Sequence, residues 1–421
     1  MRKAIRALTL AFFLVLLVVP PVANARVSIL ARPADWSRLD KFQRTITRDT
    51  FARYLRDYYA PNGAAFQLIW IDTDRALIRK GETDPGYYEL QFATSEELRR
   101  EVPVDWVPVV PGSLVGKKIA LDPGHIGGDW AKMEERWFQV GDSEPVTEGD
   151  MALLVAIKIS DRLRTSGAQV SFIRSSQQPL TPVRPGILTE EATESLKDKG
   201  VTEIQSSYSD INDPKKQNSV QWEAERLFYR LSEIRARAKR NNEILKPDLT
   251  ICLHFNAEPW GDPKLPTLVE KNHLHLLVNG QYAAEELAYD DVRLEMLEKL
   301  LGQTINTELR LSETIAKSLA HATGLPPYEY TTPNAIRAPG SHYVWLRNLL
   351  ANRLYRNPTL YLEPYVMNNM DVFDRIQMGD YDGTRMIRGV ARKSIFNEYA
   401  DAVVDALMKA ADSTATPLKT P

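Results

Sequence analysis

The sequence predicts an α/β fold, a twisted and mostly parallel sheet flanked by helices, behind a small α+β N-terminal domain. Short apolar strands alternate with amphipathic helices from about residue 117 onward, and this alternation is typical of sheets with helices on both faces. Residues 26–112 carry a separate pattern of one helix and two strands. Apolar residues make up 43% of the 421 positions, enough for a sizeable core.

The N-terminus has the features of a secretory signal peptide. Three basic residues precede an apolar run over residues 8–19, which is too short to span a bilayer comfortably. Ala23-Asn24-Ala25 fits the small-x-small cleavage pattern. We expect residues 1–25 to be removed and the mature chain to be periplasmic or extracellular; the alternative is an uncleaved anchor.

Charge and cysteine content argue against a nucleic-acid partner, a disulfide and a cysteine nucleophile. The formal net charge is −2, so no basic excess supports a nucleic-acid partner. Cys252 is the only cysteine, which excludes an internal disulfide. Because it lies within an apolar run, Cys252 is expected to be a small core residue rather than a nucleophile.

The N-terminal domain, residues 26–112, shows no chemistry of its own. An amphipathic pattern predicts a helix over residues 47–59, and strands are expected over 66–71 and 87–92. The Pro-rich stretch 102–112 is expected to be a linker.

The second domain is expected to cover residues 117–410, with a disordered tail over 411–421. Strands are predicted over 118–121, 169–173, 249–254, 273–278 and 359–362, and helices over 148–166, 220–245, 312–322 and 387–409. A polar insertion over about 175–218 contains a weak helical piece near 190–198. Long loops of this kind are either functional lids or mobile segments.

A histidine follows the first strand of this domain directly, in Asp122-Pro123-Gly124-His125. The Pro-Gly turn would place its imidazole at the edge of the sheet. Asp122 could hold the second ring nitrogen, as carboxylates next to metal-bound histidines do.

A second histidine and a glutamate are expected at the same edge of the sheet as His125. His254 ends the strand 249–254, and Glu148 begins a helix expected on the same side of the sheet. Two imidazoles and one carboxylate with an open fourth position form a catalytic zinc set. Glu363 ends another strand, and a carboxylate there can take a proton from a metal-bound water and return it to a leaving nitrogen.

Four motifs in this order resemble the zinc-dependent type 3 family of N-acetylmuramoyl-L-alanine amidases. The motifs are Ile119-Ala120-Leu121-Asp122-Pro123-Gly124-His125, Glu148-Gly149-Asp150, Cys252-Leu253-His254-Phe255-Asn256, and Pro358-Thr359-Leu360-Tyr361-Leu362-Glu363 with Asn368 beyond. The resemblance covers about residues 117–407. It implies a zinc amidase fold, similar to that of zinc exopeptidases, and hydrolysis of the bond between N-acetylmuramic acid and L-alanine in peptidoglycan.

The resemblance also implies roles for single residues and for partners. His125, Glu148 and His254 would hold Zn²⁺, Glu363 would be the catalytic base, and Asn256 and Arg337 would contact substrate. A regulatory activator protein is expected as a partner, and the chain is expected to be a monomer. The stretch between His125 and Glu148 is longer than the family norm, so Glu134, Glu135 or Glu144 could replace Glu148 as a ligand.

Other polar residues have weaker patterns. His273 and His275 share one face of a strand and suggest either a second metal site or two hydrogen-bonded histidines. Arg235 and Arg237 suggest a contact to a substrate carboxylate, or else solvated helix arginines.

The alternatives to the amidase are a catalytically silent peptidoglycan-binding protein and a metal-dependent hydrolase of another amide or ester. The insertion is interpreted as a lid, with an acidic residue that reaches the open metal position, or as a solvated loop. Its acidic residues are Glu190, Glu191, Glu194 and Asp198.

Overall fold

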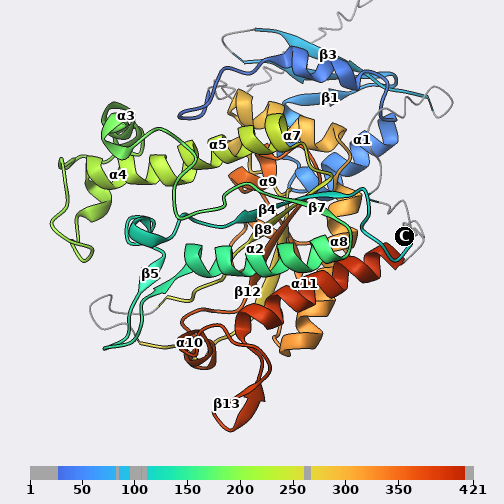
Figure 1. Ribbon diagram of the computed structural model, residues 1–421. Coiled ribbons are helices and arrows are strands. Elements are labelled where there is room, and N and C mark those ends of the chain that lie inside the picture. Colours follow the sequence, from blue (N-terminus) through green and yellow to red (C-terminus); the bar gives the residue numbers. More distant parts are fainter. Residues whose placement is uncertain (1–26, 82–84, 95–105, 107–110, 260–266, 413–421) are drawn as a thin grey trace, which may run out of the picture.

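The computed structural model describes residues 27–81, 85–94, 106, 111–259 and 267–412 (Figure 1). The expected signal peptide, most of the linker and nearly all of the tail lie outside these residues. Within them, no helix has both the length and the hydropathy needed to cross a membrane.

A seven-stranded sheet forms the centre of the described chain, in the order β10-β11-β9-β12-β8-β4-β7. Its strands are β4 (Lys118–Pro123), β7 (Gln169–Phe172), β8 (Leu249–Leu253), β9 (Leu274–Val278), β10 (Ala335–Arg337), β11 (Val344–Arg347) and β12 (Thr359–Pro364). Strands β12, β8, β4 and β7 are parallel neighbours, whereas β9 runs antiparallel to β12. The predicted fold class, a mostly parallel sheet flanked by helices, is confirmed.

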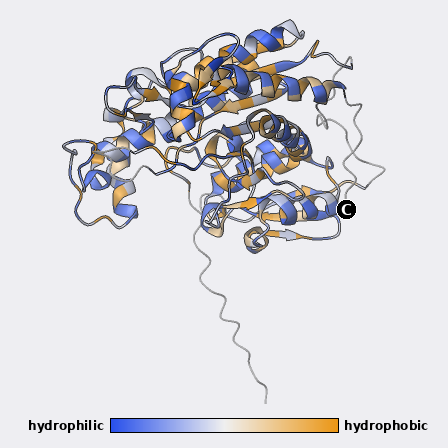
Figure 2. Ribbon diagram, turned by 90° about the horizontal axis from the view of Figure 1, so that it is seen from below, coloured by the Kyte–Doolittle hydropathy of each residue, from blue (hydrophilic) through white to orange (hydrophobic). Residues whose placement is uncertain are grey.

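Helices cover both faces of this sheet (Figure 1). On one face α2 (Glu148–Thr165), α8 (Ile305–Thr323) and α11 (Ile395–Asp412) pack together and onto the strands. On the other face lie α5 (Glu233–Lys239) and α9 (Leu350–Leu354). The helices alternate between hydrophilic and hydrophobic residues along their length (Figure 2), as expected of helices with one face on a core.

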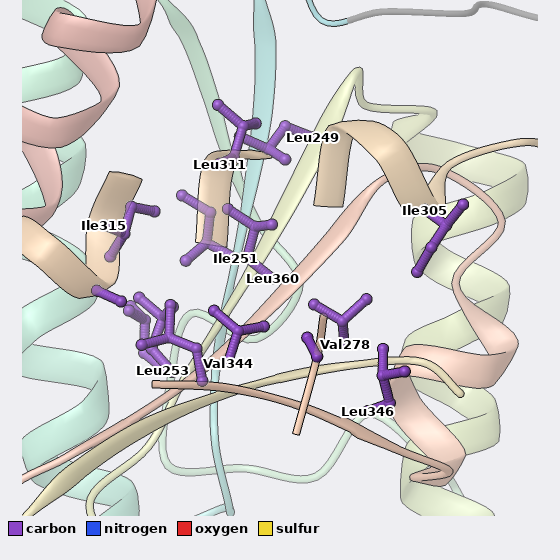
Figure 3. Packing of buried hydrophobic residues seen from close by; sticks show 14 of the residues in the cluster. Leu249, Ile251, Leu253, Val278, Ile305, Leu311, Ile315, Val344, Leu346 and Leu360 are labelled. Carbon is purple, nitrogen blue, oxygen red and sulfur yellow. The ribbon is translucent and has the colours of Figure 1, made fainter. Parts of the chain in front are cut away.

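The main core lies between the sheet and α8. Leu311 and Ile315 of that helix lie next to apolar side chains of the sheet (Figure 3). The strand residues labelled there are Leu249, Ile251, Leu253, Val278, Val344, Leu346 and Leu360. All of these side chains are fully buried, and the central strands are nearly continuous apolar runs because helices cover both faces of the sheet.

The remaining elements are mostly short. They are η1 (Trp36–Phe42), α1 (Arg48–Tyr54), η2 (Leu55–Tyr59), η3 (Ala64–Gln67), β1 (Ile69–Ile71), β2 (Arg75–Arg79), β3 (Tyr87–Gln91), η4 (Gly128–Trp130), β5 (Trp137–Phe138), β6 (Val146–Thr147), η5 (Pro185–Ile187), α3 (Thr189–Asp198), η6 (Lys216–Asn218), α4 (Val220–Leu227), η7 (Phe228–Ser232), η8 (Arg240–Leu245), α6 (Ala284–Leu287), α7 (Asp290–Leu301), α10 (Met370–Gln377), β13 (Arg385–Ile387) and β14 (Val390–Arg392).

The N-terminal segment forms a three-stranded antiparallel sheet with short helices beside it. The predicted helix 47–59 is present as α1 followed by the π-helical turn η2, while strand β2 was not predicted. Phe51 and Ile78 of this segment belong to the same buried cluster as Ile251 of the central sheet. The division of the chain near residue 112 stays a proposal.

Two predicted helices differ from the structure. The helix 220–245 is continuous but contains the π-helical segments η7 and η8. The helix predicted over 387–409 was wrong at its start, because residues 385–392 form the hairpin β13–β14 and α11 begins at Ile395. Arg388 and Gly389 both have positive φ, 48° and 77°, which is the conformation of a two-residue hairpin turn.

The polar insertion is partly ordered by packing. Its helix α3 lies against α4, where Ser195 and Lys199 bond to the buried Glu223 at 2.7 and 2.6 Å. Ala192 and Leu196 are buried. Residues 189–198 are therefore not a solvated loop.

Candidate metal centre

The turn after β4 holds His125 in an unusual backbone conformation. Its φ is +55°, in the left-handed region that non-glycine residues avoid. The carbonyl of His125 accepts a 2.6 Å hydrogen bond from Arg237 Nη2. The next two amides, of Ile126 and Gly127, donate to Glu134 Oε2 at 2.8 and 3.3 Å. These bonds fix the turn and aim the imidazole at the sheet edge.

His254 follows β8 directly and lies against Gly124 of the same turn. A Cβ atom on Gly124 would lie 2.2 Å from Cε1 of the His254 ring, so only glycine leaves room for this imidazole. On the other side, Tyr361 of β12 stacks on His254 with ring centroids 4.3 Å apart and planes at 15°. The ring is therefore held between two neighbouring strands.

Glu148, the first residue of α2, lies between the two histidines. Its Oε2 is 3.2 Å from His125 Nε2, and its Oε1 is 3.0 Å from His254 Nδ1. The backbone amide of Phe255 also donates to Oε1, at 3.2 Å. The carboxylate is buried. The three residues expected to hold a metal are thus brought together from the ends of two strands and the start of one helix.

This group fits a divalent metal ion. One ligand atom from each residue lies within 4.8 Å of the others, and within the described part of the chain His125, Glu148 and His254 form the one such group. Tetrahedral zinc with bonds of about 2.0–2.2 Å requires ligand atoms roughly 3.3–3.5 Å apart. The contacts of 3.0 and 3.2 Å, each to a different oxygen of Glu148, are slightly shorter than that spacing. Imidazole and carboxylate together suit zinc.

The charges of the three residues are strongly linked. Burial opposes ionisation of Glu148, but His125 and His254 outweigh it and hold the Glu148 pKa well below its ordinary value. For His125, burial is outweighed by Glu148 and Glu134, which raise its pKa. For His254 burial prevails and lowers the pKa. A dication here would favour the ionised carboxylate and would shift both imidazoles toward the neutral form, against the raised pKa of His125.

Glu363 lies beside this group on β12. Because Leu362 pairs with Leu253 in the parallel ladder, Glu363 is the register neighbour of His254, on a strand about 4.8 Å away. Burial and the charge of Glu148 raise the pKa of Glu363 well above its ordinary value, against the effect of Arg136 and Arg347. The carboxyl group is therefore biased toward carrying a proton.

The carboxylate beside the second nitrogen of His125 is Glu134, with Oε1 3.7 Å from Nδ1. The expectation that Asp122 fills this place was wrong. Asp122 instead accepts from Arg237 at 3.0 Å and from the Tyr355 hydroxyl at 2.5 Å, beneath the turn. Asp122, three positions before His125, is still part of strand β4, and its side chain points away from the imidazole.

Both interpretations of Arg237, a contact to a substrate carboxylate and a solvated helix arginine, were also wrong. The side chain is fully buried and binds Asp122, Glu233 and the carbonyls of the His125 turn, so it is neither solvated nor open to substrate. Arg235 lies 3.8 Å from Asp291 and 3.6 Å from Glu295, on another side of the helix.

The two residues expected to contact substrate lie outside the group. Asn256 is half-buried, and its Oδ1 accepts from the amide of Ala257 at 2.7 Å. Arg337 lies on edge strand β10, three strands from β12, or about 14 Å at the usual strand spacing. Its guanidinium lies 5.0 Å from the Trp345 ring centroid and pairs with Glu329.

His275 lies on β9, and His273 directly precedes that strand. Strand β9 borders β12 on the side away from β8. His273 Nε2 contacts Glu258 at 3.0 Å and His275 Nε2 contacts the Tyr330 hydroxyl at 3.0 Å. They do not form a metal-ligand group in the described chain. Of the two interpretations, the hydrogen-bonded pair agrees with these contacts.

Arg136 was missed by the sequence analysis. Its Nε lies 3.1 Å from Glu148 Oε2, and its carbonyl accepts from the Glu148 amide at 3.2 Å. The signal was present in Glu134-Glu135-Arg136, a charged triplet in the stretch between two candidate ligands. The acidic residues of the insertion are not part of the group.

No family model and no curated protein match this chain. Among solved structures, it is similar to the N-acetylmuramyl-L-alanine amidase Ami1 from Mycobacterium smegmatis, with 14% identity over 71% of this chain and 98% of that one, at a TM-score of 0.35. It is similar to the CwlD amidase of Clostridioides difficile in complex with the GerS lipoprotein, with 12% identity over 70% and 98%, at 0.36. It is similar to the amidase AmiC2 of Nostoc punctiforme, with 12% identity over 70% and 96%, at 0.35.

Proposed function

We propose that this chain is a zinc-dependent amidase that hydrolyses the bond between N-acetylmuramic acid and L-alanine in peptidoglycan. The observation that carries the proposal is the group of His125, Glu148 and His254 with Glu363 beside it. The four sequence motifs resembling the type 3 amidases contain these same residues, and three-ligand sites of this composition catalyse amide hydrolysis.

In this mechanism each residue has a separate task. His125, Glu148 and His254 would hold the ion, which when bound polarises a carbonyl and lowers the pKa of water. Glu363 takes a proton from the attacking water and passes it to the leaving nitrogen. A carboxyl group with a raised pKa suits both halves of that transfer.

The proposal also covers the location of the protein, its partners and its oligomeric state. Its substrate lies outside the cytoplasmic membrane, so the signal-like residues 1–25 are proposed to direct export to the periplasm or the exterior. Peptidoglycan is the proposed partner. An activator protein and a monomeric state are further parts of the proposal, and each is open to direct test by pull-down and by light scattering.

The test combines metal analysis with product analysis. Purified protein should carry about one zinc per chain, and mass spectrometry of digested peptidoglycan should show free L-alanine amino termini on released stem peptides. His254→Ala should lose both metal and activity, because one of three protein ligands is gone. His321→Ala, a change at an exposed position on α8, serves as the control.

Zinc-loaded protein that leaves peptidoglycan uncut would contradict the amidase and favour the silent binding protein. Cleavage of another amide would favour the broader hydrolase. Unchanged zinc content in His254→Ala would remove this ligand from the assignment.

A further inference from the structure

Arg136 is placed next to Glu148 by a small hairpin. Strands β5 and β6 pair Trp137 with Thr147, and the residues just outside that pair are Arg136 and Glu148. Their backbones continue the ladder through the 3.2 Å bond from the Glu148 amide to the Arg136 carbonyl. The arginine is therefore fixed on the metal group by backbone pairing as well as by its side chain.

The guanidinium of Arg136 has more N–H groups than its partners in the described chain can accept from. Nε faces Glu148 Oε2 at 3.1 Å, and Nη1 donates to the carbonyl of Glu135 at 3.0 Å. Within the described residues these are the two partners of the side chain, although a guanidinium carries five N–H groups. The side chain is 36% exposed while that of Glu148 is 2% exposed, so part of the Arg136 side chain is open to solvent.

The same guanidinium acts on the proposed base. Its positive charge and that of Arg347 both oppose the rise in the Glu363 pKa that burial and Glu148 cause, and it also interacts with Tyr361. Arg136 therefore lies close enough to interact with a metal-ligating carboxylate and with Glu363 on the neighbouring strand. An amide bound between the metal group and Glu363 would therefore lie next to this side chain.

We propose that Arg136 is a catalytic residue that donates a hydrogen bond to the carbonyl oxygen of the scissile amide. This inference rests on the proposed function. When water adds to the carbonyl carbon, the C=O π electrons move to the oxygen and negative charge develops there. The guanidinium N–H stabilises that charge without giving up its proton, while Glu363 carries the proton from water to nitrogen. Preorganised donors of this kind act chiefly on the transition state.

The experiment compares Arg136→Ala and Arg136→Lys with the unchanged protein and with Arg230→Ala. Arg230 is a nearby arginine whose side chain bonds to the Tyr229 hydroxyl instead. Zinc content, zinc affinity by chelator competition, thermal midpoint, kcat and KM are measured for each. Turnover of purified peptidoglycan by the wild-type protein is the reference. If the wild-type protein shows no turnover, the proposed function fails, whereas the metal measurements on the Arg136 variants can still be interpreted.

Arg136→Ala is expected to keep about one zinc and its fold while kcat falls by roughly 10² to 10³ with KM nearly unchanged. Added guanidinium ion at millimolar concentration should restore part of kcat in Arg136→Ala and none in Glu363→Gln. Arg136→Lys should recover little, because an ammonium group cannot bridge Glu148 and a second oxygen in the same plane.

Two results would overturn the inference. A large loss of zinc affinity in both variants, with turnover per bound zinc unchanged, would make Arg136 a positioning residue for Glu148. Unchanged kcat in a zinc-loaded Arg136→Ala protein would leave Arg136 no part in the reaction.

Discussion

At position 124 a side chain would collide with the imidazole of His254, and the next residue, His125, already has a positive φ of 55°. The sequence shows both histidines at strand ends, which is why this part of the site could be predicted. It does not show which carboxylate supports His125, because Asp122 and Glu134 are both near in sequence and only the strand geometry decides between them.

The raised pKa of Glu363 belongs to the folded state alone and was beyond sequence reasoning, since it follows from burial and from Glu148. We expect Glu363→Gln to keep its zinc and to lose turnover by roughly 10² to 10⁴, the usual contribution of general acid–base catalysis. Zinc analysis and initial rates on peptidoglycan check this. Loss of zinc would instead identify Glu363 as a ligand.

His275 provides a prediction on acid stability. Burial, with His273 and Arg347, lowers its pKa to about 3; Tyr330, Tyr328 and the cross-strand Glu363 also face it. Because the folded state disfavours the imidazolium, the unfolded chain binds more protons between pH 6.5 and 3. The contribution of His275 to stability is therefore present above pH 6.5 and lost as the pH falls.

Between pH 7 and pH 5 this loss amounts to about 2 kcal/mol. His275→Gln keeps an acceptor for the Tyr330 hydroxyl and removes the titration, so its free energy of unfolding should fall less over the same range. Urea titrations at the two pH values measure the difference. His321→Gln, at an exposed position, should behave as wild type; a parallel fall in His275→Gln would contradict the assignment.

Among the elements, the long helical run from α4 to η8 acts on the site through one buried side chain. Arg237 of α5 binds Asp122 at 3.0 Å and Glu233 at 2.8 Å, and it donates to the carbonyls of Pro123 and His125. This guanidinium connects the helix to the turn that carries His125. The helix itself was predicted from its periodicity, but the orientation of Arg237 depends on tertiary packing.

Arg237→Met should cost about 3–5 kcal/mol of stability, because two buried carboxylates lose their partner. Arg235→Met is the matched control two positions away, where the ion pairs are longer, 3.6 and 3.8 Å, and the cost should be clearly smaller. Denaturant unfolding of both variants measures this. Equal costs would mean that Arg237 contributes no more than an ordinary helix arginine.

The hairpin β13–β14 shows where periodicity misleads. Its apolar residues continued the pattern of α11, so a single helix was predicted from residue 387. Gly389 was the available signal, since a glycine that follows Arg388 permits a turn with two positive φ angles. Strand β2 was missed because its register with β1 and β3 involves neighbours that the local sequence does not identify.

At the scale of the whole molecule, five strands of the central sheet were predicted from their apolar residues, whereas the short strands β10 and β11 and the role of the insertion were not. Replacing residues 186–204 with a short Gly-Ser linker should lower the thermal midpoint, since it removes buried Ala192 and Leu196. Because α3 packs on α4 and not on the metal group, turnover should not rise.

A control keeps the helix and removes its charge by changing Glu190, Glu191, Glu194 and Asp198 to the corresponding amides. Rates on purified peptidoglycan, per bound zinc, compare the two variants with wild type. Higher turnover in the shortened chain alone would show that the insertion restrains the enzyme; higher turnover in both would assign the restraint to the acidic groups.

The separation of the metal residues along the chain has a consequence for folding. Glu148 and His254 are 106 positions apart, and a shared ion would join them as a reversible cross-link in a chain whose single cysteine is buried and unpaired. Such a cross-link exists only in the native state, so free zinc at a hundred times its dissociation constant would add about 2.7 kcal/mol to the free energy of unfolding. The half-life of this protein at high temperature would then be set by the metal buffer around it as much as by its core.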